Sequence, residues 1–344
     1  MNWRRRGWRP RHEHPAATTA VQRADSHADD PVVEDTGDGD EGGIKGGVFG
    51  ARIAADEVDQ QRPARIVAIT NQKGGVGKTT TAISLAAALA AEGIAVLLVD
   101  LDPQGNASTG LDLRVEAGQA STYQVLIDRL PGRDAVVSSS VPNLDVMPSS
   151  IDLAGAEVEL VAQVNRERRL ARAMQDLRED YDVIFLDCPP SLGILTLNAL
   201  VAADEALVPI QCEYYALEGV SQLLRTIHLV QDDLNAGLHI GGVIMTMFDA
   251  RTNLSQQVAD EIRTFFGDTA YTTIIPRTVR LSEAPSFGQP ITVFDPGSRG
   301  ARAYQRLSRE VGQRLGLIEE TGAGALDELL GIGNANEAAD HTTV

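Results

Sequence analysis

The segment of residues 71–80 reads NQKGGVGKTT and has the composition of a phosphate-binding loop. Its glycines let the backbone turn tightly and point several N–H groups at one anion. The helical pattern that follows adds the free N–H groups of a helix start. We expect Lys78 to reach the β- and γ-phosphates of a nucleotide, Thr79 to bind Mg²⁺ and Thr80 to contact the α-phosphate. The predicted nucleotide-binding set is Lys73, Gly74, Gly75, Val76, Gly77, Lys78, Thr79 and Thr80.

This loop departs from the strict P-loop pattern at two positions. Gln72 stands where the pattern has glycine, and a second lysine, Lys73, follows it. The chain contains 27 arginines but only three lysines, of which two lie in this loop. A compact ammonium fits between backbone amides where a planar guanidinium does not. One lysine is enough to hold one nucleotide, so the charge of Lys73 is free to reach elsewhere.

Two apolar segments end in carboxylates. Residues 97–102 read LLVDLD and residues 183–187 read VIFLD. Ligands of open α/β sheets bind at the carboxyl ends of the strands, so these acids are predicted to lie near the loop. Burying the carboxylate of Asp187 is unfavourable unless a cation receives it, and we expect it to hold Mg²⁺ through water. Asp100 and Asp102 would fit nucleoside triphosphate hydrolysis if one of them lies near Mg²⁺ and the other positions a water.

Short β-branched runs alternate with longer amphipathic runs through the middle of the chain, which is typical of βαβ units. This pattern predicts an α/β fold: a doubly wound, mostly parallel sheet of about seven strands flanked by helices. The expected strands are residues 65–70, 95–100, 144–148, 183–187, 206–211, 240–245 and 271–275. The expected helices are residues 79–92, 167–179, 193–202, 216–234, 255–266 and 300–315.

The 344 residues divide into three parts by composition. Residues 1–62 begin with an Arg- and Trp-rich tip, continue as an acidic, Gly-rich stretch and lack apolar periodicity, so we expect a disordered extension. Residues 63–318 are predicted to form the P-loop domain. Residues 319–344 are predicted to be a disordered acidic tail. The extension's basic tip could contact nucleic acid or the neighbouring acidic stretch.

Neither a membrane span nor a signal peptide is indicated. No apolar run approaches the roughly 20 residues that cross a bilayer, and the N-terminus lacks an apolar core segment. Cys188 and Cys212 are 24 positions apart in apolar contexts, which matches neither a metal site nor a disulfide framework. We therefore expect a cytoplasmic protein with two buried thiols.

The loop sequence resembles the deviant Walker A motif KGGxGK[ST] of the ParA/MinD family of P-loop ATPases. The resemblance implies that Lys73 crosses a dimer interface to the phosphates of the partner's ATP, giving a homodimer on ATP binding. It also implies that Asp102 orients the attacking water and that Asp187 belongs to the Walker B strand. Pro276 and Arg277 correspond to the family segment near the adenine base.

Within this family the sequence is similar to the ParA/Soj chromosome-partitioning branch. The segments 209–219 (PIQCEYYALEG), 246–253 (TMFDARTN) and 275–286 (IPRTVRLSEAPS) carry this likeness, which covers about residues 65–316. The cysteines do not match the nitrogenase iron protein. The acidic C-terminus does not match a membrane-binding MinD helix, and Tyr304 alone does not make the C-terminal cluster of a tyrosine kinase.

The net charge of −18 by itself argues against binding to a polyanion. The charge is uneven, however. Residues 245–318 contain nine arginines and seven acids, a net of +2, whereas residues 65–244 have a net of −11. Arg251 and Arg280 match family positions that contact DNA without sequence preference, and helical spacing groups Arg302, Arg306 and Arg309 on one face. DNA binding should therefore depend on pairing two basic patches in an ATP-bound dimer.

These expectations describe an ATP-dependent chromosome- or plasmid-partitioning ATPase that associates with the nucleoid. ATP and Mg²⁺ drive dimerisation, the dimer binds nonspecific DNA, and a ParB-type partner stimulates hydrolysis. Two alternatives stay open on sequence alone: an ATP-dependent metabolic ligase or synthetase, and a positioning ATPase for another cargo. The rate, the cargo, the partner's docking surface and the role of both termini are not determined by the sequence.

Overall fold

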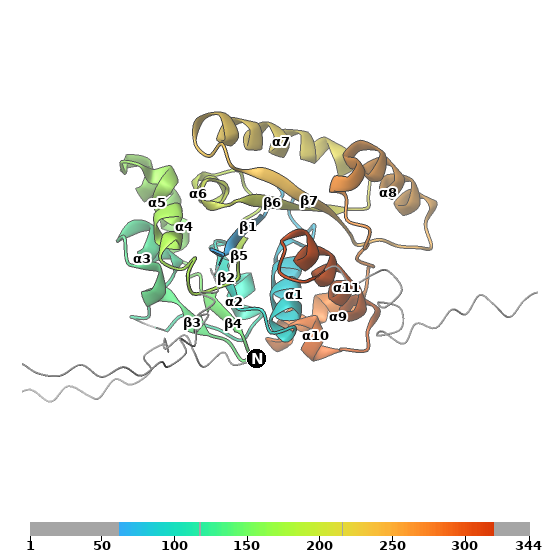
Figure 1. Ribbon diagram of the computed structural model, residues 1–344, viewed down its shortest axis with the longest axis horizontal. Helices are drawn as coiled ribbons and strands as arrows, with labels where there is room; N and C mark the ends of the chain where they lie inside the picture. Colours follow the sequence, from blue (N-terminus) through green and yellow to red (C-terminus); the bar gives the residue numbers. More distant parts are fainter. Residues whose placement is uncertain (1–61, 117, 215, 320–344) are drawn as a thin grey trace, which may run out of the picture. The chain divides into compact units, whose positions relative to one another are not determined.

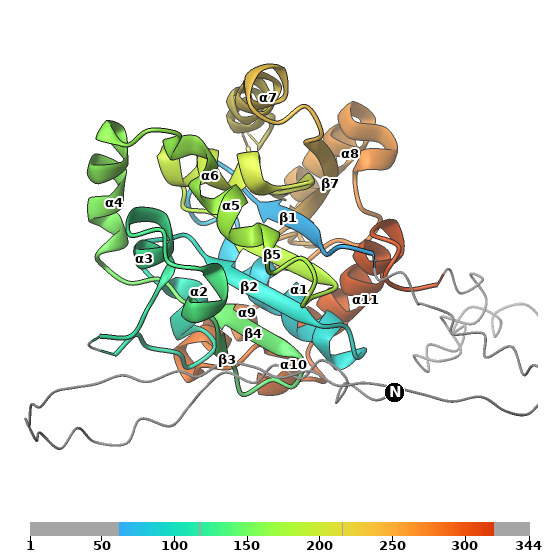
Figure 2. The same ribbon diagram turned by 60° about the vertical axis from the view of Figure 1, so that its left-hand side comes forward.

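The computed structural model describes residues 62–319 except 117 and 215, together with the backbone but not the side chain of Glu218. Apart from residues 62 and 319, the predicted N-terminal extension and acidic tail lie outside the described residues. The described part is built around a seven-stranded sheet with helices on both faces (Figures 1 and 2). Within this part, no helix is both long and apolar enough to cross a membrane.

The strand order across the sheet is β3-β4-β2-β5-β1-β6-β7. Every pairing is parallel except that of β3 with β4, which is antiparallel. The doubly wound, mostly parallel sheet predicted from the sequence is confirmed. The strands are β1 (Arg65–Ile69), β2 (Val96–Asp100), β3 (Val137–Ser138), β4 (Leu144–Met147), β5 (Val183–Asp187), β6 (Glu205–Gln211) and β7 (His239–Thr246).

One predicted strand, residues 271–275, is wrong, and the seventh strand is instead the short β3. The ends of the 271–275 segment do bond to β7, through Tyr271 N to Val243 O (2.9 Å) and Ile275 N to Met245 O (2.8 Å). Between them, the N–H groups of Thr272 and Thr273 donate to the Glu310 carboxylate instead (2.7 and 3.1 Å). This side-chain acceptor replaces the strand ladder, so no regular strand forms.

The helices form two layers, one on each face of the sheet (Figure 2). One face is covered by α3 (Thr122–Ile127), α4 (Leu153–Glu159), α5 (Arg169–Gln175), α6 (Ile194–Ala202), α7 (Ala216–Asp233) and α8 (Asn253–Phe266). The other face is covered by α1 (Lys78–Ala91), α2 (Asn106–Thr109), α9 (Val279–Glu283), α10 (Ile291–Phe294) and α11 (Arg299–Arg314). All six predicted helices are present, and the shorter ones were not predicted because they span few turns.

The helix expected at residues 167–179 is shorter than predicted. A 3₁₀ turn (Arg166–Arg168) precedes α5, which ends at Gln175. The Asn198 side chain lies at this junction, where its Oδ1 accepts from Leu170 N (3.2 Å) and its Nδ2 donates to Arg166 O (2.8 Å). The buried amide thus satisfies groups at the helix start that a continuous helix would bond internally.

Alternate residues of each central strand enter the two cores. In β1, Ile66 and Ala68 belong to the core on the α3–α8 side, whereas Val67 and Ile69 belong to the core that contains residues of α1 and α11. A strand with both faces covered reads as a continuous apolar run. This is why the sequence shows apolar runs at the central strands and not alternation.

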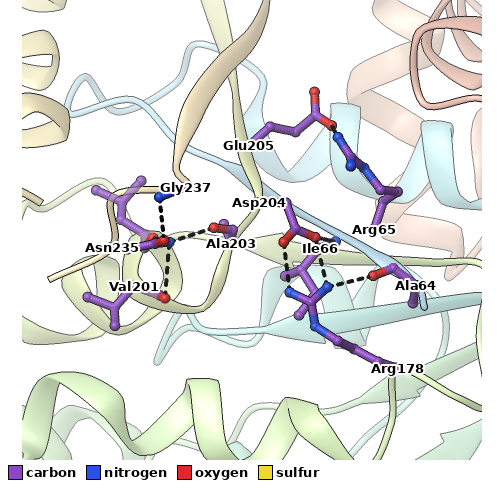
Figure 3. A network of polar contacts seen from close by, with 11 residues as sticks. Ala64, Arg65, Ile66, Arg178, Val201, Ala203, Asp204, Glu205, Asn235 and Gly237 are labelled. Atoms are coloured by element: carbon purple, nitrogen blue, oxygen red, sulfur yellow. Dashed lines mark hydrogen bonds and ion pairs between the residues drawn. The ribbon is translucent and has the colours of Figure 1, made fainter. Parts of the chain in front are cut away.

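The amino ends of the central strands are closed by a polar network (Figure 3). Asp204 accepts from Ile66 N (2.8 Å) and from both terminal nitrogens of Arg178 (2.8 and 3.1 Å). Arg178 also donates to Ala64 O (3.0 Å), and Asn235 Nδ2 donates to Ala203 O (2.7 Å). The Asp204 carboxylate at this edge is therefore paired, in contrast to the Asp187 carboxylate at the carboxyl edge.

Candidate functional site

The glycine-rich loop leaves the carboxyl end of β1 and turns directly into α1 (Figure 1). Gly75 and Gly77 have φ of +77° and +89°, a region that side-chain-bearing residues rarely adopt. Gly77 is the residue before α1, which begins at Lys78. The first-turn N–H groups of α1 have no acceptor within the helix, so the loop and the helix start together offer a cluster of donors to an anion.

Side chains from neighbouring strands fix the position of the loop. Thr246, at the end of β7, donates through Oγ1 to Val76 O (2.8 Å). Asn71 donates through Nδ2 to Pro209 O (2.7 Å) and accepts through Oδ1 from Lys73 N (3.0 Å). Neither side chain was predicted from the sequence to belong to the site. The available signal was that each is a polar residue at the carboxyl end of an apolar strand.

The two lysines of the loop differ in environment. Lys78 is 7% exposed and donates through Nζ to Lys73 O (3.2 Å), so its ammonium lies inside the loop. Burial lowers the pKa of Lys78, although nearby Asp187 opposes that shift. The side chain of Lys73 is exposed. The charge of Lys78 is thus directed inward, and that of Lys73 is accessible from outside.

Two carboxylates lie side by side at the carboxyl edge of the sheet. Asp100 and Asp187 are register partners at the ends of β2 and β5, and both are fully buried. Asp100 accepts hydrogen bonds from Ser108 Oγ (2.7 Å), Ser108 N (2.8 Å) and Asp102 N (3.1 Å). Burial raises the pKa of Asp100 to about 6 despite these bonds.

Within the described part of the chain no close hydrogen bond reaches either carboxylate oxygen of Asp187, although the nearby Thr79 hydroxyl and Lys78 ammonium partly offset the effect of burial on its pKa. Burial, and then the neighbouring Asp100, hold the pKa of Asp187 well above its usual value. Buried charged groups are normally paired or bind a metal ion, and carboxylate oxygen is a preferred ligand of Mg²⁺. The buried carboxylate therefore fits a cation site.

A cavity of about 610 Å³ lies between the loop, α2 and the turn before α10, and Asp100 and Asp187 are not among the residues that line it. It brings together Gly74, Gly75, Gly77, Lys78, Thr79, Thr80 and Asp102 from the predicted set. Its lining also includes residues that the sequence analysis did not single out: Gln104, Asn106, Thr109, Gly110, Pro190, Met247, Pro285 and Ser286. Met247 adopts a left-handed φ of +52° at this wall.

Pro276 and Arg277, predicted to lie near the base of a nucleotide, are not among the residues lining this cavity. Arg277 N donates to Phe248 O (2.9 Å), and the Arg277 guanidinium lies 3.8 Å from the Glu213 carboxylate. The structure thus places these two residues beside the end of β7. Their predicted contact with the base stays a prediction.

The predicted DNA-binding arginines lie on exposed surface, but two of them are paired with acids. Arg251 donates to both Asp249 oxygens (2.9 and 2.7 Å), which lowers the pKa of Asp249. Arg280 lies within 3.1 Å of Glu283 and 3.3 Å of Asp295. On α11, Arg302 and Arg306 are exposed, and Arg302 donates to Gly297 O (2.9 Å).

Comparisons with known proteins agree with this geometry. A family model described as "AAA domain" matches residues 64–240. The chain is 56% identical over 247 residues to the sporulation initiation inhibitor protein Soj of Bacillus subtilis, covering 72% of this chain and 98% of Soj. It is 51% identical over 251 residues to the chromosome partitioning protein ParA of Caulobacter vibrioides, covering 72% and 94% of the two chains. The chain belongs to the ParA/Soj family of chromosome-partitioning ATPases.

A solved structure of cobyrinic acid a,c-diamide synthase from Mycobacterium smegmatis, with bound ADP and magnesium, is also similar. It is 39% identical, has a TM-score of 0.64 and covers 73% of this chain and 95% of that protein. The family assignment and the P-loop fold expected from the sequence are therefore confirmed. The prediction that Cys188 and Cys212 are buried, unpaired thiols is confirmed as well.

Proposed function

We propose that this protein is an ATP-dependent partitioning switch in which ATP and Mg²⁺ occupy the cavity above β1, β2 and β5. The observation that carries the nucleotide site is the buried Asp187 carboxylate, which accepts no close hydrogen bond and lies near Thr79 and Lys78 of the glycine-rich loop. The names of the two most similar relatives described above support chromosome partitioning as the process.

In this proposal the loop and Lys78 hold the phosphates, and Thr79 with Asp187 holds Mg²⁺, the latter through water. Bound Mg²⁺ would neutralise phosphate charge that develops during hydrolysis. Asp102 is 8% exposed and lies in the cavity wall, where its carboxylate can orient a water. Its Oδ1 accepts from Gln104 N (3.0 Å), which restricts the orientation of the carboxyl group.

The accessible charge of Lys73 supports the proposed homodimer. Because Lys78 already fills the inside of the loop, Lys73 can contact the phosphates of a second copy's nucleotide. Dimerisation would double the basic surface that holds Arg251, Arg280, Arg302 and Arg306. Binding to DNA phosphates is then expected to be nonspecific, sensitive to salt and dependent on ATP.

The same proposal includes a ParB-type partner that stimulates hydrolysis and releases the dimer from DNA. It places the protein in the cytoplasm, associated with the nucleoid. Whether the cargo is a chromosome or a plasmid would be set by that partner and not by the ATP site.

The test measures binding to a random-sequence DNA duplex with ATP, with ADP and without nucleotide. ATP should give binding at least tenfold tighter than either other condition, and Asp102→Ala should retain DNA in ATP because hydrolysis is slowed to a low residual rate. Equal affinity in all three conditions would refute the switch. Hydrolysis at the parental rate by Asp102→Ala would refute the role assigned to that carboxylate.

The similarity to a protein named cobyrinic acid a,c-diamide synthase supports one second candidate, ATP-dependent amidation of a carboxylate. That candidate predicts that cobyrinic acid with an amide donor stimulates ATP turnover and that DNA with a ParB-type protein does not. The higher identity and near-complete coverage of Soj favour the partitioning proposal.

A further inference from the structure

One buried carboxylate holds both ends of the loop that carries Asp102. Asp100 Oδ1 accepts from Asp102 N (3.1 Å), at the start of the loop. Asp100 Oδ2 accepts from Ser108 N (2.8 Å) and Ser108 Oγ (2.7 Å), at its end. The residues between these anchors include Gln104 and Asn106, which line the nucleotide cavity. Both ends of this cavity wall are therefore hydrogen-bonded to a single carboxylate.

The Ser108 hydroxyl extends this arrangement to a second strand. Ser108 is 2% exposed, and its Oγ accepts from Ser149 N (3.1 Å) while it donates to Asp100. Ser149 follows β4, the neighbour of β2 in the sheet. Thr122 Oγ1 in turn donates to the backbone oxygen of Asp100 (2.9 Å). The loop is thus tied to the ends of two strands through one hydroxyl.

The loop needs such anchors because its own conformation is not a regular one. Gly105 has a left-handed φ of +61°, and α2 is only four residues long. A helix this short contributes little stability of its own. Hydrogen bonds to a charged acceptor are the stronger class, so the bonds to Asp100 are well suited to hold the loop.

We propose that the Asp100–Ser108 pair is the latch that positions Asp102 for hydrolysis, with Ser108 as a positioning residue. This inference rests on the proposed ATPase function. Without the hydroxyl, the end of the loop loses its link to Ser149 and its shortest bond to Asp100. Asp102 then samples orientations in which it does not hold the attacking water, while the phosphate loop and Lys78 are untouched. The latch therefore affects the chemical step and not nucleotide binding.

The test compares Ser108→Ala with Ser139→Ala. Ser139 is a matched control because its hydroxyl, like that of Ser108, accepts from a backbone N–H, Val141 N (3.1 Å), and donates one short hydrogen bond, here to the backbone oxygen of Leu144 (2.7 Å) and not to a carboxylate. It lies in the β3–β4 connection and does not line the nucleotide cavity. Single-turnover ATP hydrolysis, ATP affinity and the melting temperature are measured for each variant.

Ser108→Ala should lower kcat by about tenfold, the scale expected when a catalytic group is misplaced by a fraction of an ångström. Its ATP affinity should stay within about twofold of the parent, and Ser139→Ala should keep the parental kcat. Ser108→Thr retains the hydroxyl and should recover most of the rate. If Ser108→Ala does not fold, Asp100→Asn weakens the same latch from the acceptor side and is measured in the same way.

A double mutant tests whether the effect passes through Asp102. Added to Asp102→Ala, the Ser108→Ala change should lower the residual rate no further, because the group that it positions is already absent. An additional tenfold fall would overturn the latch, as would a parental kcat in Ser108→Ala or a loss of ATP affinity that parallels the loss of rate. Absence of ATP hydrolysis by the parent would contradict the proposed function as well, so the two failures are distinguishable.

Discussion

Asp187→Asn should stabilise the protein in the absence of nucleotide and magnesium, and at the same time weaken its binding of both. Asp187 is fully buried, no close hydrogen bond reaches its oxygens from the described residues, and its neighbour across the sheet is a second buried acid. Thr79 and Lys78 lie nearby, but their effect on its pKa is smaller than that of burial. These features disfavour its charged form in the absence of a cation. Asparagine has nearly the same shape but no charge, so the substitution removes this penalty without creating a cavity.

The expected increase in stability on Asp187→Asn can be bounded from general values for buried polar groups. Leaving a buried polar group unsatisfied costs on the order of 1–3 kcal/mol, and more when the group is charged. The polar atoms of the asparagine amide also lack some hydrogen-bond partners. We therefore expect the free energy of unfolding to rise by about 2 kcal/mol. In a domain of this size that corresponds to a rise of roughly 4–8 °C in melting temperature.

The assay is thermal unfolding with EDTA and without nucleotide, repeated with saturating ATP and Mg²⁺. The parent should be stabilised by the ligands through mass action, whereas Asp187→Asn should lose most of that ligand-induced shift. Asp204→Asn is the matched control at the opposite edge of the sheet. That carboxylate is paired with Arg178 and Ile66 N, so the same change should lower stability by about 1–2 kcal/mol.

A lower melting temperature for ligand-free Asp187→Asn would refute the argument that this carboxylate destabilises the ligand-free fold until a cation binds to it. An undiminished ligand-induced shift would refute its assignment to the magnesium site. If Asp187→Asn and Asp204→Asn changed the melting temperature by the same amount and in the same direction, the presence of a paired partner would not decide whether the substitution stabilises the protein. Burial would then be the deciding factor.

Further predictions concern the cations of the site and of the proposed DNA surface. Lys78→Ala should abolish ATP binding in equilibrium dialysis, because it removes the ammonium inside the loop. Lys73→Ala should keep ATP binding within a fewfold of the parent but lose ATP-dependent dimerisation in analytical ultracentrifugation; a dimer with parental affinity would contradict the role in trans. Arg251→Glu should lose DNA binding while ATPase activity and dimerisation persist. Asp249→Asn should strengthen DNA binding in low salt because it removes the negative charge and one of the two oxygen acceptors that hold Arg251, and unchanged or weaker binding would show that Asp249 instead orients the arginine.

The elements predicted most accurately are those whose structure depends on neighbouring residues in the chain. The phosphate loop, the start of α1 and the six predicted strands that the structure retains depend on local glycine placement and on continuous apolar runs. The prediction failed at residues 271–275, where the β-branched composition fits a strand. There the deciding group is Glu310, a distant side chain on α11 that takes the N–H groups a strand would need.

The same distinction applies to the site. The sequence by itself determined that an anion-binding loop, an inward lysine and several strand-end carboxylates are present, because each is encoded in a short contiguous motif. Only the tertiary structure decided that Asp100 and Asp187 are neighbours, that Ser108 joins one of them to the Asp102 loop, and that acids pair with Arg251 and Arg280. Those relations depend on strand order, register and loop closure between residues far apart in sequence. A one-residue change in the β2–β5 register would separate the two carboxylates and leave every motif in the sequence unchanged.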